Sequence, residues 1–216
     1  MIDLTAYRIV DLSAELQPGV QTVDGRYVHG REVRRLELRQ FIYAPDDMLM
    51  HWVDTETHIG THVEGPTHFR AENKDLTELP LDVFMGEAVV LDMSSLRPKD
   101  GTRQPITPVH LTPVRSGDIV LVWSPYPGRH APYLTPDAAR WLWEQRIKML
   151  GVQQIGVEAP HSMATHEYLL NNDIPLIEGL ANLEHLRRDR VFFIGLPLRI
   201  RGMDSSWIRA IALEER

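Results

Sequence analysis

The sequence predicts an α/β fold with a mixed β-sheet and few flanking helices. Short runs of β-branched and other apolar residues, each about the length of a strand, recur along the whole 216-residue chain. A long helical pattern occurs in one segment, which lies between two of those runs. Several strands with few helices between them are typical of an α/β protein with a mixed sheet.

The predicted elements follow in chain order. The helical pattern covers residues 135–150, where Pro136 suits a first turn and Gly151 ends the pattern. A shorter helix is expected over residues 162–170, and residues 97–113, rich in Pro, Thr and Gly, are expected to form a surface loop. The predicted strands are Arg8–Leu12, Ala88–Asp92, Asp118–Trp123, Gln154–Val157 and Val191–Gly195.

Length and composition predict one globular domain over residues 1–216. The net charge is −7 and Lys and Arg are scattered, which argues against a nucleic-acid partner. The charged residues Asp3 and Arg8 stand where a signal peptide would need an apolar run. No stretch of the chain approaches the about 18 uninterrupted apolar residues of a membrane span. We therefore expect neither a signal peptide nor a membrane span, and a cytoplasmic location. Phosphate-binding glycine loops and the GxSxG motif of serine hydrolases are missing from the sequence.

One short segment concentrates residues that bind metals. Residues 58–68 contain three histidines, His58, His62 and His68, together with Glu64. The chain has no cysteine, so any metal must be held by imidazole and carboxylate, the ligand set of Zn²⁺, Mn²⁺ or Fe²⁺. The main competing interpretation is a polar surface loop.

The local sequence indicates how this segment is shaped. Gly60 and the Gly65-Pro66 pair form helices poorly, which favours an extended or turning chain. Full extension would place His58 and His62 about 13 Å apart, too far for one ion, so we expect Gly60 to bend the backbone. A turn at Gly65-Pro66 would let His68 approach the open side of the ion, where it could act as a general base and then as a general acid.

The same residues resemble the HxGTHxDxPxHF signature of the cyclase family, which includes bacterial kynurenine formamidase and isatin hydrolase. In this chain the motif reads His58-x-Gly60-Thr61-His62-x-Glu64-x-Pro66-x-His68-Phe69. The resemblance extends from Val10-Asp11-Leu12-Ser13 to Arg209-Ala210-Ile211-Ala212, and therefore covers most of the chain.

The resemblance implies a core of the swivelling β/β/α type and a homo-oligomer, a dimer or tetramer. It also implies a divalent metal, Zn or Mn, as one or two ions. The ligands would be His58, His62 and Glu64, with His166 and Glu178 completing a second site, and His68 would transfer protons. The implied activity is metal-dependent hydrolysis of an amide in a small molecule, with an arylformamide of the N-formylkynurenine type as the preferred substrate.

Two alternatives stay open at this stage. One keeps the metal but opens a lactone or an isatin-like ring, or closes a ring by the reverse reaction. The other is a metal- or ligand-binding protein without catalysis. Glu64 is relevant to both, because the family usually has Asp there and the extra methylene could change how many ions the carboxylate binds.

For a few further residues the sequence allows two alternative roles. Glu158 and His161 follow a predicted strand and are either supporting groups of the site or part of a helix start. Trp52 is expected in the core or in an interface, and Trp207 could contribute to a subunit contact. Trp141 and Trp143 lie on opposite sides of the predicted helix, so one is expected to be buried and the other at a subunit contact.

Overall fold

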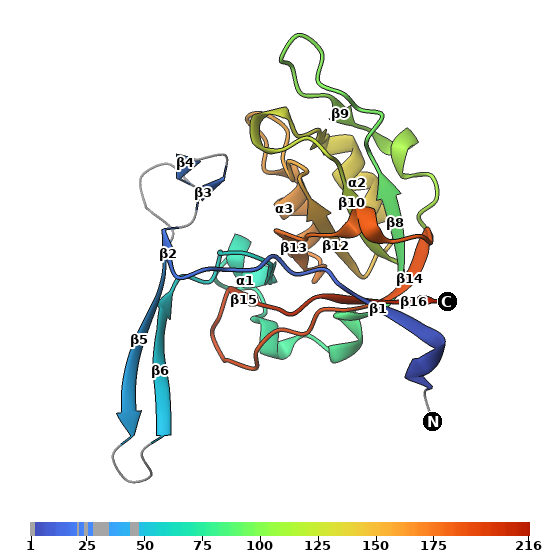
Figure 1. The fold of residues 1–216 in the computed structure, drawn as a ribbon. Helices are drawn as coiled ribbons and strands as arrows, with labels where there is room; N and C mark the ends of the chain where they lie inside the picture. Colours follow the sequence, from blue (N-terminus) through green and yellow to red (C-terminus); the bar gives the residue numbers. More distant parts are fainter. Residues whose placement is uncertain (1–2, 21, 24–25, 28–34, 44–47) are drawn as a thin grey trace.

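The computed structural model describes residues 3–20, 22–23, 26–27, 35–43 and 48–216, and its centre is a nine-stranded mixed sheet (Figure 1). The strand order is β1-β16-β14-β8-β10-β12-β13-β7-β15. The predicted α/β class with a mixed sheet is thereby confirmed. The strands of this sheet are β1 (Tyr7–Asp11), β7 (His62–Glu64), β8 (Met85–Asp92), β10 (Ile119–Trp123), β12 (Met149–Gln153), β13 (Leu176–Glu178), β14 (Arg190–Ile194), β15 (Ser205–Trp207) and β16 (Ile211–Glu215).

The four central strands are parallel and buried on both faces. Strands β8, β10, β12 and β13 run parallel, and antiparallel strands flank them on both sides. Along β10, Val120 and Val122 face one apolar core, whereas Ile119 and Leu121 face the other. This double burial explains the continuous apolar run in the sequence, because a parallel sheet that is covered on both faces has no solvent side for polar residues.

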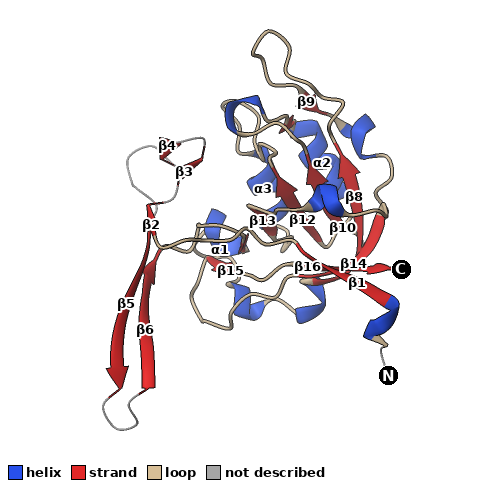
Figure 2. Cartoon of the chain, in the orientation of Figure 1, coloured by secondary structure: helices blue, strands red, loops and turns tan. Residues whose placement is uncertain are grey.

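Helices are few in the part of the chain that the structure describes (Figure 2). Helix α2 connects β10 to β12, and α3 connects β12 to β13. The α-helices are α1 (Pro66–Phe69), α2 (Pro136–Glu144) and α3 (Ala164–Leu170), and the 3₁₀ turns are η1 (Leu4–Ala6), η2 (Leu76–Glu78), η3 (Leu81–Val83), η4 (Pro108–Leu111), η5 (Gly128–His130) and η6 (Leu183–His185). None of the helices that the structure describes is long and apolar enough to cross a membrane.

The sequence prediction was wrong on one helix end and on one strand. Helix α2 ends at Glu144 instead of continuing to residue 150, because Arg146 adopts a left-handed backbone with φ 54°. The following buried residues form β12, which Gln154 ends with φ 53°, so the strand lies five residues before the predicted Gln154–Val157. Apolar residues at 147, 149, 150 and 152 fit a buried strand as well as a helix, and periodicity alone does not separate the two.

The other predictions fall within a few residues of the structure. Strands β1, β8, β10 and β14 cover the remaining predicted runs, and α3 begins two residues after its predicted start. Segment 97–113 is a loop, as expected, with the short strand β9 (Pro105–Ile106) and η4 inside it; β9 pairs with β11 (Tyr133–Leu134). Trp141 packs against the core and Trp143 is partly exposed, stacked on Tyr168.

A second, smaller sheet stands apart from the nine-stranded one. It contains β2 (Gly19–Val20), β5 (Arg35–Tyr43) and β6 (Met48–Thr55), and the separate hairpin β3 (Thr22–Val23) with β4 (Arg26–Tyr27) lies near its base. Strands β5 and β6 form a long antiparallel ribbon that projects from the body (Figures 1 and 2). We call the described residues of this ribbon, 35–43 and 48–55, the arm. The sequence analysis did not predict it.

Candidate metal centre

Gly60 bends residues 58–68 as the spacing predicts. Its φ is +62°, and a Cβ atom at this position would lie 2.8 Å from the Leu16 side chain. The bend brings the His58 and His62 rings to 5.1 Å between centroids, far less than an extended chain would allow. His62 and Glu64 then lie in β7, and the Gly65-Pro66 pair starts α1, which carries His68.

Strand β7 lies between β13 and β15, and this register assembles the site. His62 is paired with Glu178 on one side, and Glu64 is paired with Ser205 on the other. Residues from three distant parts of the chain thus meet at one edge of the sheet. His62 and Glu64 are each only 3 % exposed, which is rare for such polar residues without partners.

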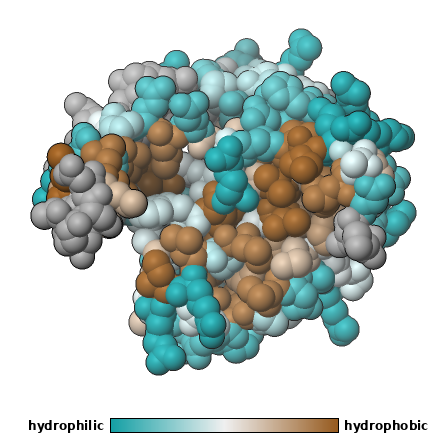
Figure 3. All heavy atoms as spheres, turned by 60° about the horizontal axis from the view of Figure 1, so that its bottom comes forward, coloured by the Kyte–Doolittle hydropathy of each residue, from teal (hydrophilic) through white to brown (hydrophobic). Residues whose placement is uncertain are grey.

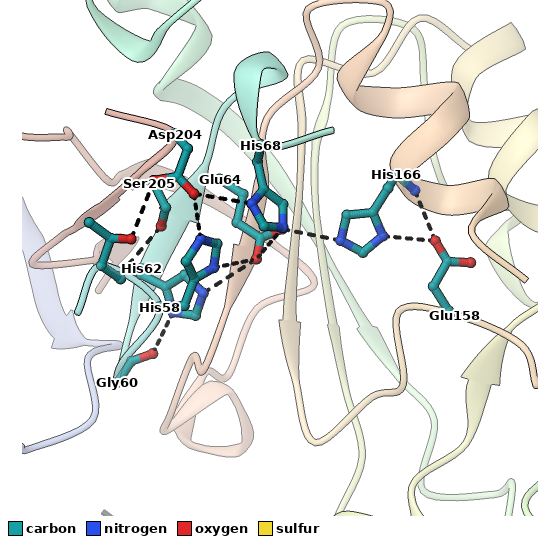
Figure 4. Close-up of polar contacts among 10 residues, drawn as sticks. His58, Gly60, His62, Glu64, His68, Glu158, His166, Asp204 and Ser205 are labelled. Atoms are coloured by element: carbon teal, nitrogen blue, oxygen red, sulfur yellow. Dashed lines mark hydrogen bonds and ion pairs between the residues drawn. The ribbon is translucent and has the colours of Figure 1, made fainter. Parts of the chain in front are cut away.

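Glu64 is the centre of the cluster, and four histidines point toward its carboxylate (Figure 4). The nitrogen to oxygen distances are 3.0 Å from His58 Nδ1, 3.5 Å from His62 Nε2, 3.9 Å from His68 Nε2 and 3.3 Å from His166 Nε2. Burial by itself raises the pKa of Glu64, but the imidazoles of His166, His58 and His62 next to its carboxylate outweigh burial and hold the pKa far below its usual range. Glu64 is therefore ionised.

The second ring nitrogen of each of these imidazoles donates a hydrogen bond to an oxygen acceptor. His62 Nδ1 donates to the Gly60 carbonyl at 2.9 Å, and His166 Nδ1 donates to Glu158 Oε1 at 2.8 Å. Asp204 Oδ2 accepts from His58 Nε2 at 2.8 Å and from His68 Nδ1 at 3.2 Å. One nitrogen of every ring is therefore fixed, and the other is directed at Glu64.

Two buried atoms at the centre have no hydrogen-bond partner among the described residues. They are Nε2 of His62 and Oε2 of Glu64. Because a carbonyl only accepts, His62 must carry its proton on Nδ1, and neutral imidazole then presents a lone pair on Nε2. A lone pair and a carboxylate oxygen that make no hydrogen bond among the described residues suit a cation, so the residues present fit a bound metal ion.

The predicted ligands form two overlapping groups around Glu64. Ligand atoms of His58, Glu64 and His68 lie within 4.8 Å of one another, and so do those of His62, Glu64 and Glu178. The structure thus brings all the predicted residues together but groups them differently from the expectation. His68 joins His58, while His166 approaches Glu64 from α3 without belonging to either group.

The charge balance of the cluster shifts further pKa values. Burial lowers the pKa of His166, but its hydrogen bonds to Glu158 and Glu64 raise it to about 10. Burial raises the pKa of Glu178, and the nearby Glu64 charge adds to that shift. Burial lowers the pKa of His58, but hydrogen bonds to Glu64 and Asp204 raise it above its usual value overall.

Asp204 is the residue that sequence reasoning missed. It lies just before β15 and also accepts a hydrogen bond from Thr57 Oγ1 at 3.3 Å. Burial raises its pKa, but the hydrogen bonds from His58 and His68 lower it overall. In the sequence it belongs to Gly202-Met-Asp-Ser-Ser-Trp207, which signals a turn and gives no indication that the chain returns to the histidines.

Glu158 and His161, which the sequence left as either supporting groups of the site or part of a helix start, have different surroundings. Glu158 is a supporting group, because its carboxylate also accepts from the backbone N–H of His166 at 2.9 Å. His161 is exposed and has a left-handed backbone, with φ 61°. Trp207 donates from Nε1 to the Glu56 carbonyl at 2.9 Å and so ties β15 to the base of the arm.

Comparison with known proteins places this arrangement in context. The family model described as "Putative cyclase" matches residues 10–159. The kynurenine formamidase of Erythrobacter litoralis is 28% identical over 217 residues, covering 96% of this chain and 94% of the relative. That of Salinibacter ruber is 31% identical over 167 residues, covering 72% of this chain and 75% of the relative.

Solved structures share the fold. Isatin hydrolase A from Ralstonia solanacearum has a TM-score of 0.80 at 22% identity and covers 98% of this chain and 93% of its own. A predicted metal-dependent hydrolase from Bacillus stearothermophilus has a TM-score of 0.77 at 21% identity and covers 97% and 100% respectively. At these identities the likeness concerns the fold.

Proposed function

The chain belongs to the cyclase family, and from that membership and the geometry of the site we propose that it is a metal-dependent hydrolase of an arylformamide. The observation that supports this most directly is the ring of histidines around Glu64, each fixed by one nitrogen and directed inward by the other. The reaction adds water to the formyl carbon, breaks the carbon–nitrogen bond and releases formate and an arylamine.

We assign the metal to Glu64 and its neighbours. By the family resemblance, His58, His62 and Glu64 would hold one divalent ion, and Glu64, His166 and Glu178 a second, with Zn²⁺ or Mn²⁺ as the candidates. His68, whose ring nitrogen also lies beside the ligand atoms of His58 and Glu64, then stays free for proton transfer. When bound, such an ion supplies Lewis acidity that polarises the formyl carbonyl and lowers the pKa of a water molecule. His58 donates a hydrogen bond to Asp204, and His166 donates one to Glu158. Histidines that bind metals commonly donate their second N–H to a carboxylate in this way, which fixes the orientation of the ring.

His68 is the residue we assign to proton transfer. Its side chain is 31% exposed, whereas those of His62 and Glu64 are 4% exposed, so it lies where a substrate can reach it. Asp204 holds Nδ1, which leaves Nε2 to take a proton from the attacking water and to return it to the leaving nitrogen. Asp204 thus positions both His58, a proposed metal ligand, and His68, the proposed proton-transfer residue, through one carboxylate.

The assignment is tested by separating metal content from turnover. His58→Ala and His62→Ala should lose both bound metal, measured by elemental analysis, and formamidase activity. His68→Gln should keep the metal and lose turnover by about 10²–10⁴-fold. His185→Ala, an exposed histidine on η6, is the control and should retain both. Full metal retention in both alanine variants would refute the ligand assignment.

The substrate class is tested with a panel of arylformamides, lactones and isatin-like cyclic amides. We expect the highest kcat/KM for an arylformamide. A higher value for a cyclic substrate would move the proposal to ring opening, and no turnover by fully metallated protein would indicate a binding protein.

We also propose that the chain is one domain and acts as a homo-oligomer of two or four copies. The single-domain assignment is supported by the nine-stranded sheet, in which β1 near the start of the chain pairs with β16 near its end.

A further inference from the structure

A cavity rich in arginine lies at the end of the nine-stranded sheet that carries β1 and β16. Its volume is about 590 Å³, which is within the range of sites that bind small molecules. The residues that line it are Arg8, Arg187, Arg188, Glu214, Glu215 and Arg216. Four arginines and two glutamates give the lining a net charge of +2, in a chain whose net charge is −7. Positive charge is thus concentrated in one hollow of an acidic protein.

One of the two glutamates already has all its partners within the protein. Glu214 in β16 is only 2% exposed, and its Oε2 accepts hydrogen bonds from Arg8 Nε at 2.8 Å and from Arg8 Nη2 at 2.5 Å. Its Oε1 accepts from the backbone N–H of Arg187 at 2.5 Å and of Arg188 at 2.9 Å. Burial raises the pKa of Glu214, but these hydrogen bonds lower it overall. Glu214 is therefore ionised, neutralises Arg8 and fixes the backbone at residues 187 and 188.

The other three arginines of the cavity have no carboxylate partner. Within the part of the chain that the structure describes, the guanidiniums of Arg187, Arg188 and Arg216 form no ion pair. The neighbouring Arg190 differs, because it forms two ion pairs with acidic residues. Arg187 and Arg188 are exposed in the segment between η6 and β14, and Arg216 donates from Nε to the Tyr7 carbonyl at 3.3 Å. Three positive charges are therefore available to a ligand.

The number of available guanidiniums indicates the class of anion. A guanidinium presents a planar fork of N–H donors that matches the oxygens of a carboxylate or a phosphate. A carboxylate offers one charge and two oxygens, which a single guanidinium can satisfy. A phosphate monoester carries about −1.5 to −2 charges and three acceptor oxygens, so it can contact two or three guanidiniums at once. The net charge of +2 on the lining is matched by one such group.

We propose that this cavity binds a small phosphorylated molecule, whose phosphate group contacts the guanidiniums of Arg187, Arg188 and Arg216. Because Glu214 holds the backbone at residues 187 and 188, two of the three guanidiniums extend from a fixed point. Such preorganisation reduces the conformational entropy that is lost when a ligand binds. Glu215 is the remaining carboxylate of the lining, and its charge opposes the anion.

The proposed anion site is remote from the metal centre. Six steps between neighbouring strands, of about 4.8 Å each, separate β16 from β7 along the sheet. In Figure 1 the C-terminal end of β16 and helix α1 lie on opposite sides of the body. The face that Figure 3 brings forward has another character, because hydrophobic side chains gather on it and on the arm. The arginine cavity is thus separate from the metal centre and differs chemically from the apolar surface.

The first test is calorimetric titration of the metal-loaded protein with glucose 6-phosphate at fixed ionic strength. We expect one molecule bound per chain and no binding of glucose, the uncharged match. Arg187→Gln combined with Arg188→Gln should weaken binding by at least ~10-fold, because two charge-assisted contacts are lost. Arg97→Gln combined with Arg129→Gln is the control, since it removes the same charge from exposed residues outside the cavity. No binding by the wild type, or an equal loss in both double variants, would overturn the proposal.

The second test looks for a gain of affinity, which a folding defect cannot produce. Glu215→Gln removes the opposing charge and should tighten binding of glucose 6-phosphate by about 2–5-fold. Unchanged or weaker binding by this variant would count against the site. Succinate, a dicarboxylate, should bind more weakly than glucose 6-phosphate at the same ionic strength, and equal or tighter binding would overturn the phosphate class. Both tests measure binding, so their failure would leave the proposed hydrolase intact, and absence of turnover would leave the anion site intact.

Discussion

The metal-centre segment and the arm are adjacent in the chain and depart from ordinary burial in opposite directions. Residues 58–68 bury the Glu64 carboxylate and the His62 imidazole inside the body, whereas residues 38–43 and 48–53 expose aliphatic and aromatic side chains to solvent. Both departures cost stability in an isolated chain, since buried polar atoms without partners and exposed apolar area are each unfavourable. The metal-centre segment therefore points to a cation from outside the chain, and the arm to a surface that covers its apolar side chains.

The largest expected effect comes from removing the charge at the centre of the metal site. Glu64→Gln keeps the shape of the side chain but removes the negative charge that four histidines face. We expect loss of bound metal and at least ~10³-fold loss of kcat/KM, equivalent to about 4 kcal/mol of transition-state stabilisation. Elemental analysis and steady-state kinetics measure the two effects. Glu64→Asp, the usual family residue, is the matched control and should keep metal.

A smaller effect is expected from the residue that positions the histidines. Asp204→Asn removes the charge that holds His58 Nε2 and His68 Nδ1. Metal affinity or kcat should fall by about 10–100-fold, the usual result of losing a group behind a metal ligand. A purely structural role would lower the melting temperature without changing the pH profile of kcat, so a shifted profile at unchanged stability supports positioning. Unchanged metal affinity, kcat and profile would contradict it.

The third effect concerns the stability of metal-free protein as pH changes. His166 has a folded-state pKa of about 10, above the ordinary 6.5, so its protonated form stabilises the folded state fully below pH 6.5. That stabilisation, a few kcal/mol, is lost as pH rises through about 10. Chelator-treated protein should melt at progressively lower temperature between pH 6.5 and 10. His166→Gln should flatten this slope relative to the wild type, and an equal slope in both proteins would argue against the assignment.

The smallest effect tests whether the two regions are independent. The arm variant Ile42→Lys with Leu49→Lys lies outside the metal centre and should leave metal content per chain within experimental error. Elemental analysis of the variant beside the wild type measures this. A substantial loss of metal would mean that the arm stabilises the centre, and the comparison between the regions would have to be revised.

Local sequence patterns predicted much of the sheet but not the boundary between helix and strand. The run Ile119–Trp123 has the length and apolar character of a buried strand, and it forms β10. By contrast, residues 147–152 also continue the apolar pattern of α2, and only the left-handed backbone at Arg146 separates the helix from β12. Local propensity does not show such a backbone reversal, because packing of β12 between β10 and β13 selects it.

The arm could not be predicted from its individual residues either. Val53 and Trp52 are consistent with a core strand or an interface, and the sequence favours neither. Their exposure follows from the absence of any pairing between the arm and the nine-stranded sheet in the part of the chain that the structure describes.

The sequence by itself determined which ligand types are available to the proposed centre, because the lack of cysteine leaves imidazole and carboxylate, and the spacing of His58, Gly60 and His62 requires a bend if both rings bind one ion. Its motif also identified the family. Only the tertiary structure decided which distant groups support that segment, since β13 and β15 bring Glu178 and Asp204 to β7 from more than a hundred residues away. Ligand type is a property of side chains and can be read locally, whereas the partner of each ligand depends on strand register, which the whole sheet determines.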